Sequence, residues 1–251
     1  MEEYVKLNSN NGIGTIEFFH PQSNSLPNHI LEKLANTITN AGKDDEIKVI
    51  ILKSKGERAF CAGASFDELV AIDNKAKGKK FFSGFANVIN AARKCPKFII
   101  GRIQGKAVGG GVGMASATDY CFATRFSSVK LSELAIGIGP FVIAPVVQRK
   151  LGLAHFTNMC LNPKEWKTSA WAQDKGIYSE VYSHMDDLNF RLSQLINEYV
   201  NYSSETIFKI KSMFWDGFDS IEKEMEKRAE QSGELVLSDF TKKILKSLQS
   251  K

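Results

Sequence analysis

A run of glycines is the feature that most constrains what this sequence can fold into. Gly109, Gly110 and Gly111 are consecutive, and Gly113 follows two residues later within KAVGGGVGMASATD (residues 106–119). Glycine gives up more backbone freedom on folding than any other residue, so such a run needs a reason. An apolar stretch precedes it and an Ala/Ser-rich stretch follows it, which predicts a strand-to-helix turn whose N–H groups lie at the positive end of a helix dipole.

This turn is open to three interpretations: a bare turn, a dinucleotide phosphate loop, or a site where backbone N–H groups contact a reacting oxygen. The dinucleotide fingerprint G-x-G-x-x-G fails, because its sixth position, counted from Gly109, is Met114. An acidic residue does lie further along at about the spacing the fingerprint needs, at Glu133. The failed glycine pattern makes the dinucleotide interpretation the weaker one.

A second turn of small residues occurs in RAFCAGASFDEL (residues 58–69), which also follows a buried strand and opens a helix. The carboxyl ends of neighbouring parallel strands meet at one edge of a sheet, where open α/β folds bind ligands. If each turn offers one N–H group there, the pair forms an oxyanion hole for a thioester carbonyl that becomes an enolate.

The hydrophobic pattern predicts an α/β fold with a mainly parallel sheet and a C-terminal helical layer. Strands are expected over residues 12–20, 48–54 and 97–105. Helices are expected over residues 25–42 and 66–94, the second with a charged break at DNKAKGKK (73–80), and almost throughout from residue 140 onward. No internal repeat or low-complexity linker divides the chain.

Composition excludes several functional classes. No apolar run is long enough to span a membrane, and the N-terminal MEEYVKLNSNNG is not a targeting signal. The net charge of +5 comes with short Lys/Arg clusters that fit solvated helix faces better than a nucleic-acid surface. The four cysteines form no C-x-x-C pair, which favours buried apolar thiols and a cytoplasmic location over a zinc site or disulfides.

Both turns, with their flanking residues, resemble motifs of the crotonase (enoyl-CoA hydratase/isomerase) superfamily. AFCAGASFDEL resembles A-F-C-A-G-A-D-[LIF]-x-E-[LM], and IQGKAVGGGVGMASATDYCFATRFSSVKLSELAIGIGP resembles the family's glycine segment followed by x-x-E-x-x-x-G-x-x-P. The likeness covers about residues 12–176. It implies a crotonase fold of stacked ββα units, with a core over residues 1–195 and a C-terminal helical trimerisation region over residues 196–251.

The resemblance also assigns roles to individual positions. It implies that the N–H groups of Ala64 and Gly110 form the oxyanion hole. It further implies substrate contacts at Ala62, Ser65, Phe66, Gly109, Pro140 and Phe141. Ser65 departs from the family's usual aspartate, and Pro140 and Phe141 stand in a segment that is glycine-rich in the hydratases, which suggests a reshaped acyl pocket.

The family's hydratases carry two glutamates, and this chain keeps one. The first position is Gly113, whereas the second is Glu133 in KLSELAIG. One carboxylate beside an oxyanion hole suffices to move a proton from the α to the γ carbon, which resembles the single-glutamate enoyl-CoA isomerases. Hydration, decarboxylation of a CoA- or carrier-protein-bound thioester, and a non-catalytic acyl-CoA- or RNA-binding role stay open as alternatives.

The ligand and assembly are expected to follow from the same likeness. The expected ligand is an acyl-CoA thioester, with coenzyme A as part of the substrate and no separate cofactor, metal, nucleic acid or membrane partner. Lys209 and Lys211 are candidates for its phosphates, and Asp119 has a structural role. The four histidines lie outside the matched motifs, so none is expected to be catalytic. The family's trimers and hexamers imply a homotrimer or hexamer.

Overall fold

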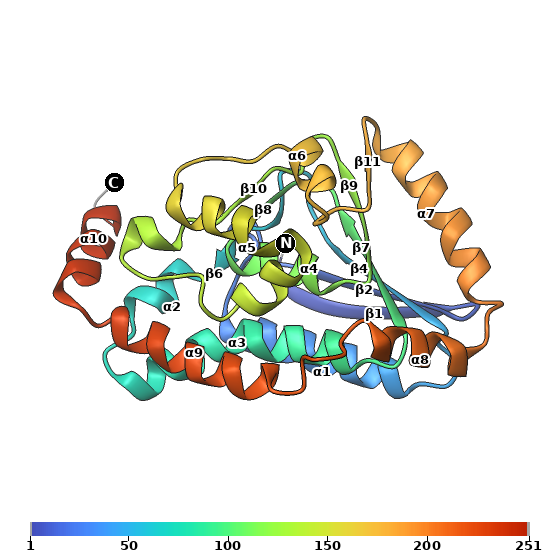
Figure 1. The fold of residues 1–251 in the computed structure, drawn as a ribbon, viewed down its shortest axis with the longest axis horizontal. Helices are drawn as coiled ribbons and strands as arrows, with labels where there is room; N and C mark the ends of the chain where they lie inside the picture. The colour runs from blue at the N-terminus through green and yellow to red at the C-terminus, as the bar shows by residue number, and fades with distance from the viewer. Residues whose placement is uncertain (1, 250–251) are drawn as a thin grey trace.

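A six-stranded sheet in the order β1–β2–β4–β7–β9–β11 forms the centre of the protein (Figure 1). The structure is a computed structural model that describes residues 2–249. The strands are β1 (Tyr4–Asn10), β2 (Ile13–Phe19), β4 (Val49–Ser54), β7 (Phe98–Ile103), β9 (Tyr120–Thr124) and β11 (Glu180–Tyr182). Only the β1–β2 pair is antiparallel; the other four neighbouring pairs of this sheet are parallel, as the hydrophobic pattern predicts.

Two small sheets adjoin the large one. β5 (Ala59–Cys61), β8 (Lys106–Val108) and β10 (Val129–Lys130) form a parallel three-stranded sheet, and β3 (Ser25–Leu26) pairs with β6 (Gly63–Ala64). Each strand of the three-stranded sheet follows a long strand of the central sheet and precedes a helix. This arrangement confirms the expected stacked ββα units of a crotonase fold.

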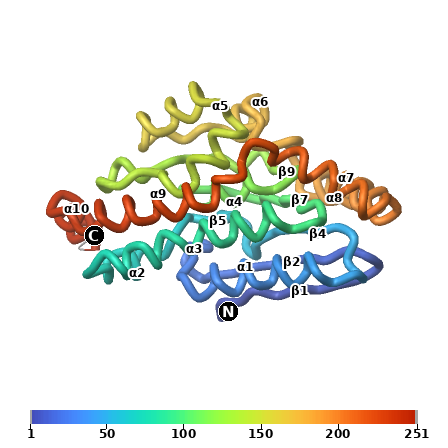
Figure 2. The backbone as a smooth tube through the Cα atoms, turned by 60° about the horizontal axis from the view of Figure 1, so that its bottom comes forward, coloured from blue at the N-terminus to red at the C-terminus, as the bar shows by residue number. Residues whose placement is uncertain are grey.

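Helices cover both faces of the central sheet. They are α1 (Asn28–Lys43), α2 (Phe66–Val70), α3 (Lys75–Lys94), α4 (Gly110–Ala117), η1 (Glu133–Ile136), α5 (Ala144–Leu161), α6 (Ser169–Asp174), α7 (Met185–Tyr199), α8 (Ser204–Met213), α9 (Ile221–Leu235) and α10 (Asp239–Gln249). Helices α1, α3 and α9 lie side by side (Figure 2), whereas α7 packs on the opposite face through Leu188 and Leu192 against Ile100 and Phe122. None of the described helices is both long and apolar enough to cross a membrane.

Helix α9 is held close to α3 at a pair of glycines. A Cβ atom at Gly78 would lie 2.7 Å from the Cα of Gly233, so neither position accepts a side chain without displacing a helix. This approach brings Ser232, which is buried on α9, toward the interior. A residue late in the chain thereby reaches the region where the two glycine-containing turns meet.

Several boundaries differ from the sequence-based expectations. Ser25 and Leu26 form a strand rather than the start of a helix, because Pro27 disfavours helical backbone in the residue before it and itself adopts extended dihedral angles. The break between α2 and α3 lies over residues 71–74, and Asn74 caps α3 through a side-chain bond to the N–H of Lys77 (2.9 Å). Most of the predicted charged break is therefore helical.

The C-terminal half is mainly helical, as predicted, with β11 as its exception. Its last part forms α8, α9 and α10. β1 has no counterpart in the sequence prediction. The expected boundary between residues 195 and 196 falls inside α7.

Candidate active site

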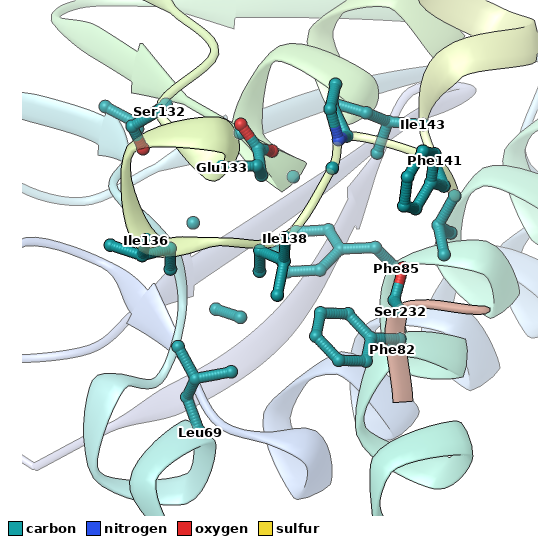
Figure 3. Close-up of a pocket in the computed structure, with 18 of the residues that line it drawn as sticks. Leu69, Phe82, Phe85, Ser132, Glu133, Ile136, Ile138, Phe141, Ile143 and Ser232 are labelled. Atoms are coloured by element: carbon teal, nitrogen blue, oxygen red, sulfur yellow. The ribbon is translucent and has the colours of Figure 1, made fainter. Parts of the chain in front are cut away.

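A cavity of about 120 Å³ lies where the two small-residue turns approach η1 and the start of α5 (Figure 3). Its lining is mostly apolar. Among the positions singled out from the sequence, it is lined by Ala62, Ala64, Gly109, Gly110, Glu133, Pro140 and Phe141. The fold therefore brings residues from three separate ββα units to one small space.

The two turns are in direct contact. A Cβ atom at Gly111 would lie 2.5 Å from the carbonyl oxygen of Cys61, and one at Gly63 would lie 3.3 Å from the carbonyl oxygen of Val108. Pairing of β5 with β8 fixes this approach through the Cys61–Ala107 register. Small residues in both turns thus allow two backbone segments to meet without intervening side chains.

Gly109 makes the sharp transition from β8 to α4. Its φ of 53° and ψ of −116° lie in a region that residues with a side chain rarely adopt. Its N–H donates to the carbonyl oxygen of Lys130 (3.0 Å), which anchors the turn, and α4 begins at Gly110. The N–H groups of Val112 and Gly113 donate to the carbonyl oxygen of Gly109 (2.9 and 3.2 Å), whereas Gly110 is the first helical residue and has no earlier residue of the helix as a partner. The helix dipole makes this end attractive to negative charge.

Glu133, the first residue of η1, places its carboxylate against Gly109. A Cβ atom at Gly109 would lie 2.7 Å from Oε1 of Glu133, so a side chain here would collide with the carboxylate. The residue as a whole is partly exposed, but its Oε2 atom is buried and has no hydrogen-bond partner among the described residues. Glu133 is the acidic residue of the cavity lining, and Figure 3 shows it beside Ser132.

Burial alters the acidity of Glu133. Loss of solvation raises its pKa from the ordinary 4.5 to about 7, while the backbone N–H groups of Glu133 and Ser132 oppose this shift. A carboxyl group with a pKa near neutrality is present in both protonation states at neutral pH. Such a group can both accept and return a proton.

The position of the missing second glutamate is closed by packing. A Cβ atom at Gly113 would lie 2.5 Å from Cγ2 and 2.8 Å from Cβ of Ile143, and 3.3 Å from Cδ1 of Ile89. Ile143 is buried and lines the cavity. The wall where the hydratases carry their other carboxylate is thus hydrocarbon in this chain, with no room for a longer side chain.

Two expected contact residues do not line the cavity. Ser65 is buried at the start of α2, where its hydroxyl accepts a hydrogen bond from the N–H of Glu68 (3.3 Å). Phe66 packs with the hydrophobic cluster around Leu69 and Ile72. Their placement gives both residues a role in positioning α2 next to the turn.

The expectation that Lys211 binds substrate phosphates is wrong. Its side chain is 2% exposed, its Nζ lies 2.8 Å from Oδ2 of Asp119, and it donates to the carbonyl oxygen of Lys97 (2.8 Å). Asp119 also accepts from the N–H of Ile99 (2.8 Å), which is a structural contact as expected. Lys209 is exposed and pairs with Glu205 one helical turn away.

Cysteines and histidines do not contribute to this cavity. Cys61, Cys95 and Cys121 are buried free thiols, and burial raises the pKa of both Cys61 and Cys121 to about 12. None of the four histidines is among the lining residues. His20, for example, directly follows β2 and lies 3.1 Å from Glu3.

Sequence reasoning missed a group of lining residues on α3 and α9. They are Phe81, Phe82, Phe85 and Ser232. The three phenylalanines share one face of a helix, and this spacing predicts only that their side chains are buried. Ser232 reaches the cavity through the glycine contact between α3 and α9, and no local pattern marks it.

A model of the enoyl-CoA hydratase/isomerase family matches residues 8–250. The chain belongs to this family. Its fold is similar to that of an enoyl-CoA hydratase from Bacillus halodurans, with a TM-score of 0.91 over 97% of this chain and 99% of that chain at 21% identity. A putative enoyl-CoA hydratase/isomerase from Acinetobacter baumannii gives a TM-score of 0.82 at 15% identity, covering 95% of this chain and 99% of that chain. At such identities the likeness shows the fold alone.

Relatives within the family differ in their named activities. A bacillaene synthase dehydratase of Bacillus subtilis is 28% identical over 63% of this chain and 62% of its own length, so the match spans less than two thirds of that relative. A probable enoyl-CoA hydratase of the same species is 23% identical over 95% of this chain and 93% of the relative. A peroxisomal dienoyl-CoA isomerase of Arabidopsis thaliana is 24% identical over 74% of this chain and 71% of the relative.

Proposed function

We propose that this chain is an enoyl-CoA isomerase that moves a double bond from the 3 to the 2 position of an acyl-CoA thioester. The observation that carries the proposal is one buried carboxylate, Glu133, in a cavity where Ile143 closes the position of a second one. One base of raised pKa fits a reaction in which a proton leaves one carbon and returns to another. Addition of water would instead need a further group to orient the water molecule.

The reaction follows from the residues in order. Glu133 takes a proton from the α carbon, and the electron pair of that C–H bond moves into an enolate whose negative charge rests on the thioester oxygen. The N–H groups of Ala64 and Gly110 would hold that oxygen, and one such donor is worth roughly 10²–10³ in rate. The protonated Glu133 then delivers the same proton to the γ carbon as the double bond shifts.

The apolar walls support this use of Glu133. Phe82, Phe85 and Ile143 line the same cavity as the carboxylate, and burial keeps the pKa of Glu133 near neutrality. They would also surround an enolate with a medium of low polarity, in which the two N–H groups act more strongly. General acid–base transfer of this kind contributes about 10²–10⁴ to the rate.

Hydration is the second candidate, because two hydroxyl groups share the cavity with Glu133. Ser132 and Ser232 both line it, and Ser232 donates to the carbonyl oxygen of Arg228 (3.1 Å) while its oxygen stays free to accept. A water molecule oriented by these hydroxyls would be the nucleophile. The named activities of the dehydratase and hydratase relatives support keeping this alternative.

Assays of 3-enoyl- and 2-enoyl-CoA on the wild type, Glu133→Gln and Glu198→Gln test the proposal. Glu198 is an exposed carboxylate on α7 and serves as the matched control. The wild type and Glu198→Gln are expected to convert 3-enoyl- to 2-enoyl-CoA. In Glu133→Gln the rate of this conversion should be lower by a factor of at least about 10². Unchanged turnover in Glu133→Gln would remove this residue from the mechanism, and faster hydration than isomerisation would favour the hydratase. Binding of acyl-CoA without turnover would indicate a binding protein.

A further inference from the structure

A second, larger cavity lies directly behind the wall of the first. It has a volume of about 680 Å³ and is bounded by η1, both halves of α5, the second half of α9 and the start of α10. Residues 138–141 line both cavities, so a single stretch of chain between η1 and α5 separates them. This stretch belongs to no helix or strand.

The ring of Phe141 is the movable part of this wall. It is partly exposed and rests on the backbone of Gly139, where a Cβ atom would lie 2.5 Å from the ring carbon Cζ. Figure 3 shows the ring beside Ile143 at the edge of the first cavity. Side chains that are not fully buried change rotamer rapidly, and displacement of this ring would join the two spaces.

The walls of the second cavity suit hydrocarbon. They are formed mainly by Leu134, Phe156, Cys160, Leu161, Leu235 and Phe240. Arg228 is the cation among them, but its guanidinium already pairs with Glu224 and donates to the carbonyl oxygen of Phe141 (3.3 Å). With this charge compensated, an apolar occupant is favoured over one that carries its own carboxylate.

The second cavity begins close to the reacting carboxylate. Leu134, which lines it, follows Glu133 in the chain. Cys160 lines it too, and burial, followed by the charge of Glu133, raises the pKa of its thiol to about 11. An acyl chain that reacts at Glu133 would therefore reach the second space by passing the stretch 138–141, which carries the Phe141 ring.

We propose that Phe141 gates a passage from the Glu133 cavity and that the second cavity holds the hydrocarbon tail of a medium- or long-chain acyl thioester. This inference rests on the proposed function, because it takes the acyl group to react beside Glu133. Each methylene that leaves water for such a cavity tightens binding up to about fourfold. The dissociation constant should therefore continue to fall for acyl chains that are longer than the first cavity can hold.

Calorimetric titration with saturated acyl-CoA esters of increasing chain length tests this inference without requiring turnover. Cys160→Phe fills the second cavity, and Phe141→Ala removes the gate. Leu153→Phe makes a comparable addition at an exposed position of α5 that lines neither cavity. Unfolding midpoints of the variants identify any loss of folding.

For the wild type and Leu153→Phe, the affinity is expected to rise by about fourfold or less with each added methylene, and this rise should continue into long acyl chains. Cys160→Phe should stop gaining after short chains, and Phe141→Ala should bind long chains more tightly than the wild type does. Affinity that stays level from short to long chains in both the wild type and Phe141→Ala would overturn the inference while leaving the proposed function in place. Equal chain-length profiles for Cys160→Phe and Leu153→Phe would also overturn it. Absence of binding at every chain length would overturn the proposed function together with this inference.

Discussion

At the scale of single residues, Glu133 destabilises the folded state when it is charged, and the same burial gives it the pKa that its proposed role as a base needs. A buried carboxylate with an unpartnered oxygen, here Oε2, is unfavourable when charged, and burial raises the pKa of Glu133 to about 7. Glycines at 109 and 113 serve the same site in different ways. Gly109 leaves space for the carboxylate, and Gly113 leaves space for Ile143.

Replacing Glu133 with Gln should change the pH dependence of stability. Between about pH 4.5 and pH 7 the folded protein keeps the Glu133 proton while the unfolded chain loses it, so stability falls as pH rises through this window. Across this window the free energy of unfolding of the wild type should fall by about 3 kcal/mol, and this fall should be absent in Glu133→Gln. Urea unfolding of both proteins at about pH 5 and about pH 8 measures the difference. An equal pH effect in the two proteins would show that Glu133 titrates normally.

Gly113→Ala should destabilise the protein although alanine is usually the better helix former. Its Cβ would lie 2.5 Å from Cγ2 of Ile143, and overpacking of this kind costs about 1–3 kcal/mol. Ile143→Gly removes both atoms, Cγ2 and Cβ, that lie within 3 Å of the added Cβ, so the double variant should lose at least about 1 kcal/mol less than the sum of the single variants. Unfolding free energies of the four proteins give the coupling. Additive losses would contradict the proposed close contact.

At the scale of elements, strand-to-helix turns were predictable and long-range contacts were not. The glycine run and the second small-residue turn are local patterns with a local cause, and both turns lie where the sequence places them. Lys211 shows the opposite case. Its sequence context on an amphipathic stretch resembles that of Lys209, and only the packing of α8 against β7 and Asp119 decides that one is buried and the other exposed.

Lys211→Met should therefore be far more damaging than Lys209→Met. Removing Lys211 leaves Asp119 buried without its cation, which costs about 3–5 kcal/mol. The exposed pair of Lys209 with Glu205 contributes less than about 1 kcal/mol. Unfolding free energies of the two variants compare them directly. Similar values would mean that the Lys211–Asp119 pair does not anchor α8.

At the scale of the whole molecule, the parallel sheet and the helical C-terminal half could be read from hydrophobic periodicity, and the family from motifs. The assembly of the cavity could not. Phe81, Phe85 and Ser232 reach it through the packing of α3 and α9, which depends on contacts between residues far apart in the chain. The same holds for Ile143, because no local pattern shows that it fills the space beside Gly113.

The trimer implied by the family resemblance stays a prediction for the whole molecule. Large apolar side chains are exposed on several helices, among them Leu153 on α5, Phe190 on α7 and Phe208 on α8. Association would remove such surface from water. Light scattering coupled to size-exclusion chromatography should give a mass of at least three chains. A mass of one chain at micromolar concentration would contradict the prediction.

The most direct test of the central claim is the transfer of deuterium from the α carbon to the γ carbon of a 3-enoyl-CoA that is deuterated at its α carbon, followed by NMR. If Glu133 takes this deuteron and the N–H groups of Ala64 and Gly110 hold the enolate, the wild type should incorporate deuterium at the γ carbon as the double bond moves. The rate of this incorporation should rise with pH toward a plateau above about pH 7, where Glu133 is deprotonated. In Glu133→Gln the rate should be lower by a factor of at least about 10². Equal deuterium incorporation by the wild type and Glu133→Gln would contradict the account.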